Sequence, residues 1–230
     1  MKILSIASSS SGNCYSISDG SSTLLVECGI PLKQIMKNAD LLHVDACLIT
    51  HEHQDHSKAA KDIVKYMPIY ASFGTIKKLN VPLEQFYKLK TLQHNKSEII
   101  NSFLVIPFDT QHDAEEPLGF LIYSMVTKER VLFATDTYYI KCQFRNLDYI
   151  MVECNYSEDL LSDDLTKTER LRLLQSHFEF GNVKKFLSAT DLSKCKRIYL
   201  LHLSDRNSDE KRFQKEIEAL TGIPVEVCGK

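Results

Sequence analysis

Apolar residues along this chain gather in short runs that are separated by polar turns. The run at 44–50 is dominated by apolar residues, which is typical of a strand buried on both faces. Period-two runs predict strands at 2–7, 14–18, 22–28, 69–71, 103–108, 119–126, 131–134, 149–153, 197–201 and 225–227. Helical spacing predicts helices at 31–39, 57–66, 73–79, 162–175, 182–190 and 209–220. Hairpins come first and alternating strands and helices follow, so we expect an α/β protein with mixed sheets, forming a single domain over 1–230.

Composition narrows the possible environments and partners. The chain has 230 residues, a net charge of −2 and a pI near 6.4, which argues against a broad basic face that grips duplex nucleic acid by charge alone. No stretch reaches the roughly 18 apolar residues that a membrane span needs. The apolar start at 1–7 lacks a clear cleavage pattern, so we expect a cytoplasmic protein without a membrane segment. Seven cysteines without a C-x-x-C pair predict reduced, mostly buried thiols.

Polar residues recur where the predicted apolar strands end. These ends carry Thr50-His51, residues 109–112, Thr135-Asp136, Glu153 and Leu201-His202. Ligands and catalytic groups in α/β sheets gather at the carboxyl ends of strands. Five such coincidences in one chain indicate a functional site that several strands build together.

The densest group of candidate ligands follows the strand at 44–50. His51, Glu52, His53, Asp55 and His56 fall within six residues. Imidazole nitrogen and carboxylate oxygen suit zinc, manganese or iron. From a loop leaving a strand, His51 and His53 can point together, while Asp55 and His56 turn toward a second ion. The spacing therefore predicts a site for two divalent metal ions.

The sequence H-x-H-x-D-H at 51–56 resembles the signature of the metallo-β-lactamase superfamily. That resemblance implies an αββα sandwich of two mixed β-sheets flanked by helices. It also implies a ligand assignment that covers almost the whole chain: His51, His53 and His112 on one metal, Asp55, His56 and His202 on the other, and Asp136 bridging the two. The chain departs from the family at Glu27, where an aspartate is usual, so we expect an altered supporting contact there.

A narrower resemblance is carried by three segments. They are Ser9–Asn13, His112–Phe120 with its His-Asp-Ala and Pro-Leu-Gly-Phe parts, and Glu153-x-Asn155. They are similar to the YycJ (WalJ) subgroup and, more remotely, to ribonuclease Z and the PhnP phosphodiesterases. The subgroup implies a phosphodiesterase, in the first instance a nuclease that acts on DNA or RNA through a metal-bridging hydroxide.

The same resemblance suggests roles for individual residues. Asp55 would orient the attacking water and take its proton. His177 would protonate the leaving group, with Glu153 holding its tautomer and raising its pKa; the plainer alternatives are a helix-end histidine and a solvated strand end. We assign substrate contacts to Asn155, Ser204 and Tyr138, although simple packing would also explain the tyrosine.

The sequence leaves two other functions open. One is a phosphodiesterase for a small substrate such as a cyclic mononucleotide, as in phage enzymes of this fold that degrade bacterial defence signals. The other, weaker one is a non-catalytic metal-binding regulatory protein. The choice among zinc, manganese and iron is also open, because mixed histidine and aspartate sites bind several of these ions. A homodimer is a further expectation, since relatives with small substrates often complete the site from a neighbouring subunit.

Overall fold

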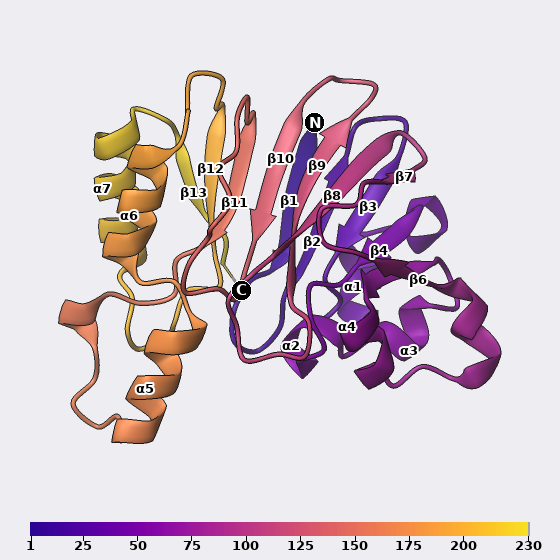
Figure 1. Ribbon diagram of the computed structural model, residues 1–230, viewed down its shortest axis with the longest axis horizontal. Coiled ribbons are helices and arrows are strands. Elements are labelled where there is room, and N and C mark those ends of the chain that lie inside the picture. Colours follow the sequence, from indigo (N-terminus) through magenta and orange to yellow (C-terminus); the bar gives the residue numbers. More distant parts are fainter. Residues whose placement is uncertain (230) are drawn as a thin grey trace.

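Two β-sheets pack face to face with helices on their outer sides in the computed structural model, which describes residues 1–229 (Figure 1). The first sheet contains, in spatial order, β1 Lys2–Ala7, β2 Cys14–Ser18, β3 Thr23–Val26, β4 Ala46–Leu48, β5 Ile69–Ser72 and β6 Leu89–Leu92. The second contains, in the order from β13 to β7, β13 Val225–Val227, β12 Arg197–Leu201, β11 Tyr149–Glu153, β10 Arg130–Ala134, β9 Leu118–Ser124, β8 Phe103–Asp109 and β7 Glu98–Ile100. The expected αββα sandwich is confirmed.

Both sheets are mixed. The first begins with the antiparallel meander β1–β2–β3 and continues with parallel pairs from β3 to β6. The second is antiparallel from β7 to β10 and parallel from β10 to β13. As a result β8, β10, β11 and β12 all run in the same direction, so their carboxyl ends meet at one edge of the sandwich.

Alternating side chains divide the core into three layers. Leu24 and Val26 point between the sheets, whereas Leu25 packs in the layer between the first sheet and its outer helices. In β11, Met151 faces the other sheet while Ile150 faces the outer helices. Both β3 and β11 are therefore apolar on both sides, which explains their nearly continuous apolar runs in the sequence.

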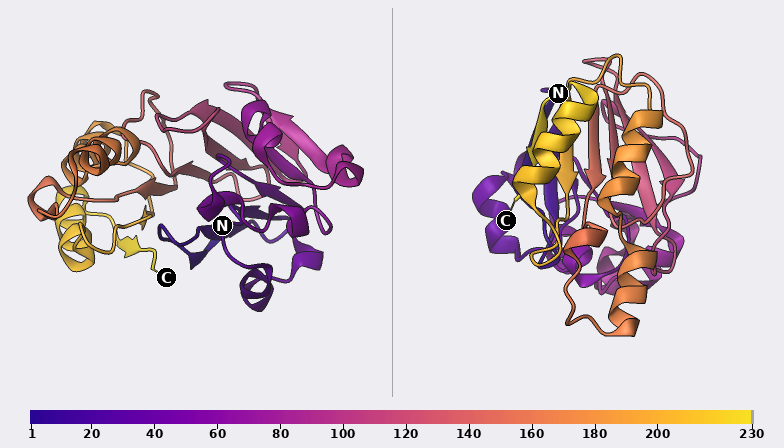
Figure 2. Two further views of the ribbon diagram at one scale, coloured as in Figure 1. Left: turned by 90° about the horizontal axis from the view of Figure 1, so that it is seen from below. Right: turned by 90° about the vertical axis from the view of Figure 1, so that its left-hand side faces the viewer.

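Helices cover the outer face of each sheet. They are α1 Leu32–Asn38, α2 Gln54–Ser57, α3 Ala60–Ile63, α4 Phe73–Lys78, α5 Lys167–Ser176, α6 Phe180–Ala189 and α7 Glu210–Thr221, with 3-10 turns η1 Leu41–His43, η2 Leu83–Lys88 and η3 Glu158–Leu160. The helices α6 and α7 flank β11–β13, α1, α3 and α4 lie on the opposite side, and α5 projects from the body (Figures 1 and 2). No helix within residues 1–229 is both long and apolar enough to cross a bilayer.

Two predicted helices differ from the observed ones, and two observed strands were not predicted. The helix expected at 57–66 is two short helices, and α2 already begins at Gln54, because the backbone turns at Ala59. The helix expected at 162–175 begins only at Lys167, where Thr166 and Glu169 form a reciprocal capping box. Short strands β6 and β7 were not predicted, since their alternation extends over only three or four residues.

Candidate metal centre

Seven histidine and aspartate side chains meet at the edge of the sandwich where the parallel strands end. His51 follows β4 and His112 follows β8, whereas Asp136 and His202 follow β10 and β12. The shared strand direction brings these distant segments together, as expected for α/β sheets. His53 is the N-cap of α2, and Asp55 and His56 occupy its first turn, so the local fold of 51–57 is a loop followed at once by a helix.

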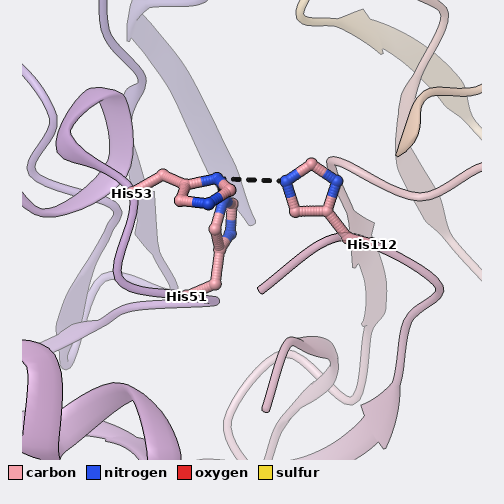
Figure 3. Close-up of side chains that lie close together, drawn as sticks. All are labelled: His51, His53 and His112. Carbon is pink, nitrogen blue, oxygen red and sulfur yellow. Dashed lines mark hydrogen bonds between the residues drawn. The ribbon is translucent and has the colours of Figure 1, made fainter. Parts of the chain in front are cut away.

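One group of three histidines has its ring nitrogens pointing at a common centre (Figure 3). Nε2 of His51 lies 3.0 Å from Nδ1 of His53, and Nε2 of His112 lies 3.2 Å from the same atom. All three ligand atoms lie within 4.8 Å of one another. Three imidazole nitrogens on one point are the donor set of a first-row transition metal.

Hydrogen bonds on the far side of these rings are compatible with the tautomer that metal binding needs, and for His112 they select it. Nδ1 of His112 lies 2.9 Å from the carbonyl oxygen of Ser176, which can only accept, so this nitrogen carries the proton. Nδ1 of His51 lies 2.9 Å from the Thr50 hydroxyl, which can accept in the same way. In both rings Nε2 then presents its lone pair to the centre, as in metal-ligating histidines generally.

A second group of four ligand atoms lies beside the first. Asp55, His56, Asp136 and His202 also offer atoms within 4.8 Å of one another. Nε2 of His56 lies 3.2 Å from the Asp55 carboxylate, and Nε2 of His202 lies 3.6 Å from it. Within residues 1–229, Nε2 of His202 is buried and has no hydrogen-bond partner. An orphaned imidazole nitrogen aimed at carboxylates fits a cation between them.

Asp136 lies between the two groups. Its Oδ2 atom is 3.6 Å from Nε2 of His112, 3.4 Å from Nε2 of His56 and 3.9 Å from Nε2 of His51. One carboxylate oxygen is therefore within reach of ligands from both groups. This position is the one a bridging carboxylate requires.

The charge balance of the site also fits divalent cations. Asp136 and Glu153 are buried and Asp55 is largely so, and in the described part of the chain their ion-pair partners within 4.0 Å are all histidines. Burying carboxylates without compensating charge is costly. Metal ions would supply that charge, so the residues present suit divalent metal binding.

Glu153 holds two histidines with one carboxylate oxygen. Its Oε1 atom accepts from Nδ1 of His177 at 2.6 Å and lies 3.1 Å from Nδ1 of His202. Its Oε2 atom accepts from the backbone N–H groups of Thr137 and Phe178 at 2.8 and 3.1 Å. The carboxylate is fully buried and satisfied on both oxygens, so it fixes both rings in place and is no solvated strand end.

Electrostatics in the site follow from this arrangement. Burial lowers the pKa of His51, and His56 lowers it further, which keeps the imidazole neutral as a ligand must be. Burial opposes the charged form of Glu153, but His177 outweighs it and lowers the pKa of the carboxyl. Burial likewise opposes the charged form of His177, yet the Glu153 carboxylate raises the pKa of that imidazole overall.

The backbone is strained at three supporting positions. Glu27, Asp136 and His202 have positive φ angles of 65°, 46° and 53°. Such conformations cost roughly 1–3 kcal/mol for residues other than glycine and cluster at functional sites. Two of the three are candidate ligands, so packing forces these side chains inward.

A polar network behind the site joins two candidate ligands of the second group, His202 and His56. Ser8 accepts from the His202 backbone N–H at 2.8 Å and lies 2.7 Å from the Tyr15 hydroxyl. Tyr15 donates to Asn13 at 3.1 Å, and the Asn13 amide lies 3.2 Å from Nε2 of His56. The sequence singled out the Ser-Gly-Asn loop as a motif but gave no sign of the contribution of Ser8 and Tyr15.

Glu27 occupies the position where the family has aspartate. Its carboxylate accepts from the Thr50 backbone N–H at 3.3 Å, and its Oε1 atom lies 3.6 Å from Nδ1 of His56. Burial raises the pKa of this carboxyl. The Glu27 carboxylate thus faces His56 at a distance beyond a hydrogen bond.

The residues expected to contact substrate lie in three different settings. Asn155 is buried and donates to the His202 carbonyl at 2.8 Å, which makes it a support for that ligand. The Ser204 hydroxyl accepts from Asn207 within its own loop at 3.3 Å. Neither lines the cavity of about 440 Å³ over the metal centre. Tyr138 is 41% exposed and lines an adjoining cavity.

Two residues of α5 at the rim of the site, Arg172 and Ser176, were not predicted from the sequence. Arg172 donates to the Asp113 carboxylate at 3.0 Å, and Ser176 donates to its other oxygen at 3.0 Å. Asp113 therefore ties α5 to the loop that carries His112. Arg172 lines the cavity of the metal centre beside His177. No local pattern distinguishes this arginine from the other charges of α5.

Comparisons with known proteins agree with this geometry. A family model described as a beta-lactamase superfamily domain matches residues 23–203. The exodeoxyribonuclease YycJ of Bacillus anthracis is 27% identical over 225 residues, covering 89% of this chain and 83% of that protein. The exodeoxyribonuclease WalJ of Streptococcus pneumoniae is 28% identical over 222 residues, covering 88% and 81%. The metallo-β-lactamase fold protein YhfI of Bacillus subtilis superposes with a TM-score of 0.75 at 17% identity, covering 99% and 95%.

The fold and the convergent histidine and aspartate ligands define a metal-dependent hydrolase. The chain belongs to the metallo-β-lactamase superfamily. The resemblance to the YycJ and WalJ proteins, expected from the sequence, is confirmed.

Proposed function

We propose that this protein is a dinuclear metal-dependent nuclease that hydrolyses phosphodiester bonds in DNA. The observation that carries the proposal is the His177–Glu153 pair, whose Nδ1 and Oε1 atoms are 2.6 Å apart at the rim of the metal centre. A proton donor held there serves a substrate with a poor leaving group, such as the sugar oxygen of a polynucleotide. The YycJ and WalJ relatives, which are named exodeoxyribonucleases, support DNA over RNA.

The proposed ligands divide into two sets. His51, His53 and His112 would hold one ion. Asp55, His56 and His202 would hold the other, with Asp136 between them. Two divalent ions, zinc or manganese in the first instance and iron as a further candidate, would polarise a phosphoryl oxygen and lower the pKa of a water molecule.

The protein's own groups would handle the two proton transfers. The Asp55 side chain is 24% exposed, lines the cavity, and can orient the attacking water and accept its proton. Nδ1 of His177 is committed to Glu153, so Nε2 is left to face the cavity that the ring lines. Glu153 raises the pKa of His177, which keeps a proton available for the departing oxygen.

A panel of substrates tests the proposal. Purified protein is offered single-stranded DNA, duplex DNA, RNA and cyclic mononucleotides with Mn²⁺ or Zn²⁺, beside Asp55→Ala and His56→Ala controls. We expect DNA to be cut by the native protein and not by the controls. Hydrolysis of cyclic mononucleotides alone would replace the nuclease with a small-substrate phosphodiesterase, and no hydrolysis of any phosphodiester would refute both.

The proton-donor role has a test of its own. His177→Ala should lower kcat on a substrate with a poor leaving group by about 10²–10⁴ fold, the usual contribution of a general acid. An activated aryl phosphodiester, which needs no protonation of its leaving group, should lose far less. Equal losses on both substrates would rule out this role for His177.

A further inference from the structure

A second hollow lies beyond the metal centre, between the loop that follows Asp136 and helix α6. This loop–α6 pocket has a volume of about 670 Å³ and is lined chiefly by residues 138–145 and by residues of α6. That volume is in the range of ligand-binding pockets. None of the candidate metal ligands lines it.

The lining of the loop–α6 pocket combines positive charge with aromatic rings. The lining contains three cations, Lys141, Arg145 and Lys185, and a single carboxylate, Asp191. Among residues 1–229, ion pairs within 4.0 Å involve none of these three cations. Tyr139, another lining residue, is 54% exposed. Sites that bind single-stranded nucleic acid combine cations along the phosphate backbone with aromatic side chains on which the bases stack.

The pocket is linked to the metal centre by a middle cavity that shares lining residues with both. A middle cavity of about 580 Å³ shares Tyr138 with the loop–α6 pocket. It shares His112 and Arg172 with the cavity over the metal centre. The three hollows therefore adjoin one another in order, from the proposed reaction site, past Arg172 and Tyr138, to the basic and aromatic pocket.

The pocket walls are also hydrogen-bonded to segments that carry candidate site residues. Tyr138 stands two residues after Asp136, and its backbone N–H donates to the Gln111 carbonyl at 3.1 Å, next to His112. Phe178, which lines the pocket, follows His177 and donates its N–H to Glu153 at 3.1 Å. A DNA strand bound in this pocket would thus be held in a fixed position relative to the candidate metal centre.

We propose that the loop–α6 pocket binds nucleotides of a single-stranded DNA substrate at some distance from the bond that is cut. Tyr138 and Tyr139 would stack on bases, and Lys141, Arg145 and Lys185 would contact phosphates. This inference rests on the proposed nuclease function and deepens it, because a cyclic mononucleotide has no second nucleotide to extend into the pocket. It would also allow a chain of net negative charge to bind a polymer, because these cations lie where the DNA strand would pass.

The test compares substrates of increasing length. The metal-loaded Lys141→Ala/Arg145→Ala variant and a Tyr139→Ala variant are assayed on oligothymidylates, from the dinucleotide upward. We expect KM for long oligonucleotides to rise about tenfold, with kcat retained and with little change on the dinucleotide. The salt dependence of binding should weaken by about 0.7 in logarithmic slope for each phosphate contact removed.

The matched control removes two exposed lysines from the other helical layer. Lys33→Ala/Lys37→Ala on α1 has the same change in net charge and should leave both KM and the salt slope as in the native protein. If KM for long oligonucleotides is unchanged in the pocket variants, or if the dinucleotide loses equally, the pocket assignment is wrong while the nuclease stands. If native protein cuts cyclic mononucleotides and no oligonucleotide, the nuclease and the pocket assignment fail together.

Discussion

Glu153 accepts a hydrogen bond of 2.6 Å from His177, although the two residues are 24 positions apart in the sequence. The same carboxylate oxygen lies 3.1 Å from Nδ1 of His202. One buried residue therefore connects the proposed proton donor with a proposed metal ligand. Any change at Glu153 should affect both leaving-group protonation and metal binding.

Glu153→Gln tests that double role. The amide keeps the shape but can no longer serve as a charged acceptor for both rings. We expect metal affinity to fall about 10–100 fold, the usual effect of losing a support for a ligand. At saturating metal, kcat should still fall more on a substrate with a poor leaving group than on an activated aryl phosphodiester. Metal titration followed by kinetics at saturation separates the two effects, and a variant with native metal affinity would contradict the contact to His202.

Thr50→Val tests the tautomer of His51. The substitution is nearly isosteric but removes the hydroxyl that lies 2.9 Å from Nδ1. We expect metal affinity to decrease about tenfold, because the ring is no longer oriented with Nε2 toward the centre. Thr50→Ser keeps the hydroxyl and serves as the control. Equal affinities in Val and Ser variants, measured by competition with a chelator, would show that this contact is dispensable.

Gly29→Ala tests the packing beneath the ligand helix. A methyl group at this position would lie 1.6 Å from the Asp55 carbonyl oxygen, which belongs to the backbone and cannot move alone. The same carbonyl accepts from Asn13 at 2.7 Å. We expect a loss of about 3 kcal/mol in the free energy of unfolding together with weaker metal binding. Gly20→Ala places its methyl in open space, although at a positive φ angle, and should cost less in thermal or denaturant unfolding. A Gly29→Ala protein with native stability would show that α2 can shift freely.

Asp19→Asn tests a buried carboxylate that joins the two sheets. Asp19 accepts from the Ser102 and Ser124 hydroxyls at 2.7 Å each and from two backbone N–H groups of its own turn. Burial opposes ionisation, but these hydrogen bonds outweigh it and lower the pKa of the carboxyl. A lowered pKa in the folded state means stability that is fully present above the ordinary aspartate pKa and is lost as pH falls through the folded value.

The measurement is the free energy of unfolding of Asp19→Asn and native protein across pH. We expect the variant to be less stable by about 1–2 kcal/mol near neutral pH, and the difference to shrink below about pH 4. The exposed Asp163→Asn serves as the control and should show little difference at any pH. A difference that stays constant through the acid range would mean that the charge of Asp19 contributes nothing.

Much of the site was predictable because its signals are local. The candidate ligands of residues 51–56 are close together in the chain, and His112, Asp136 and His202 each follow a recognisable apolar strand. Strand direction then brings these ends to one edge, which is a general property of α/β sheets. The two mixed sheets followed from the same alternation of hairpins and apolar runs.

Supporting contacts were less accessible to prediction. Asn155 was expected to touch substrate, yet it is buried against His202. Ser8, which follows β1, and Tyr15 of β2 reach the metal centre through a chain of hydrogen bonds. Whether a polar residue faces a ligand, a cavity or its own loop depends on side-chain orientation, which the pattern of a single segment does not encode.

The sequence by itself determined the types of candidate ligand, their spacing and the strand ends that carry them, because those depend on neighbouring residues and on period-two burial. Only the tertiary structure decided that the Ser176 carbonyl fixes the tautomer of His112 from 64 positions away, and that one Glu153 oxygen serves two histidines. The order of adjoining cavities from the metal centre to the loop–α6 pocket is likewise a product of tertiary packing. Such features arise where segments distant in the chain pack together, and no local pattern specifies which atoms then meet.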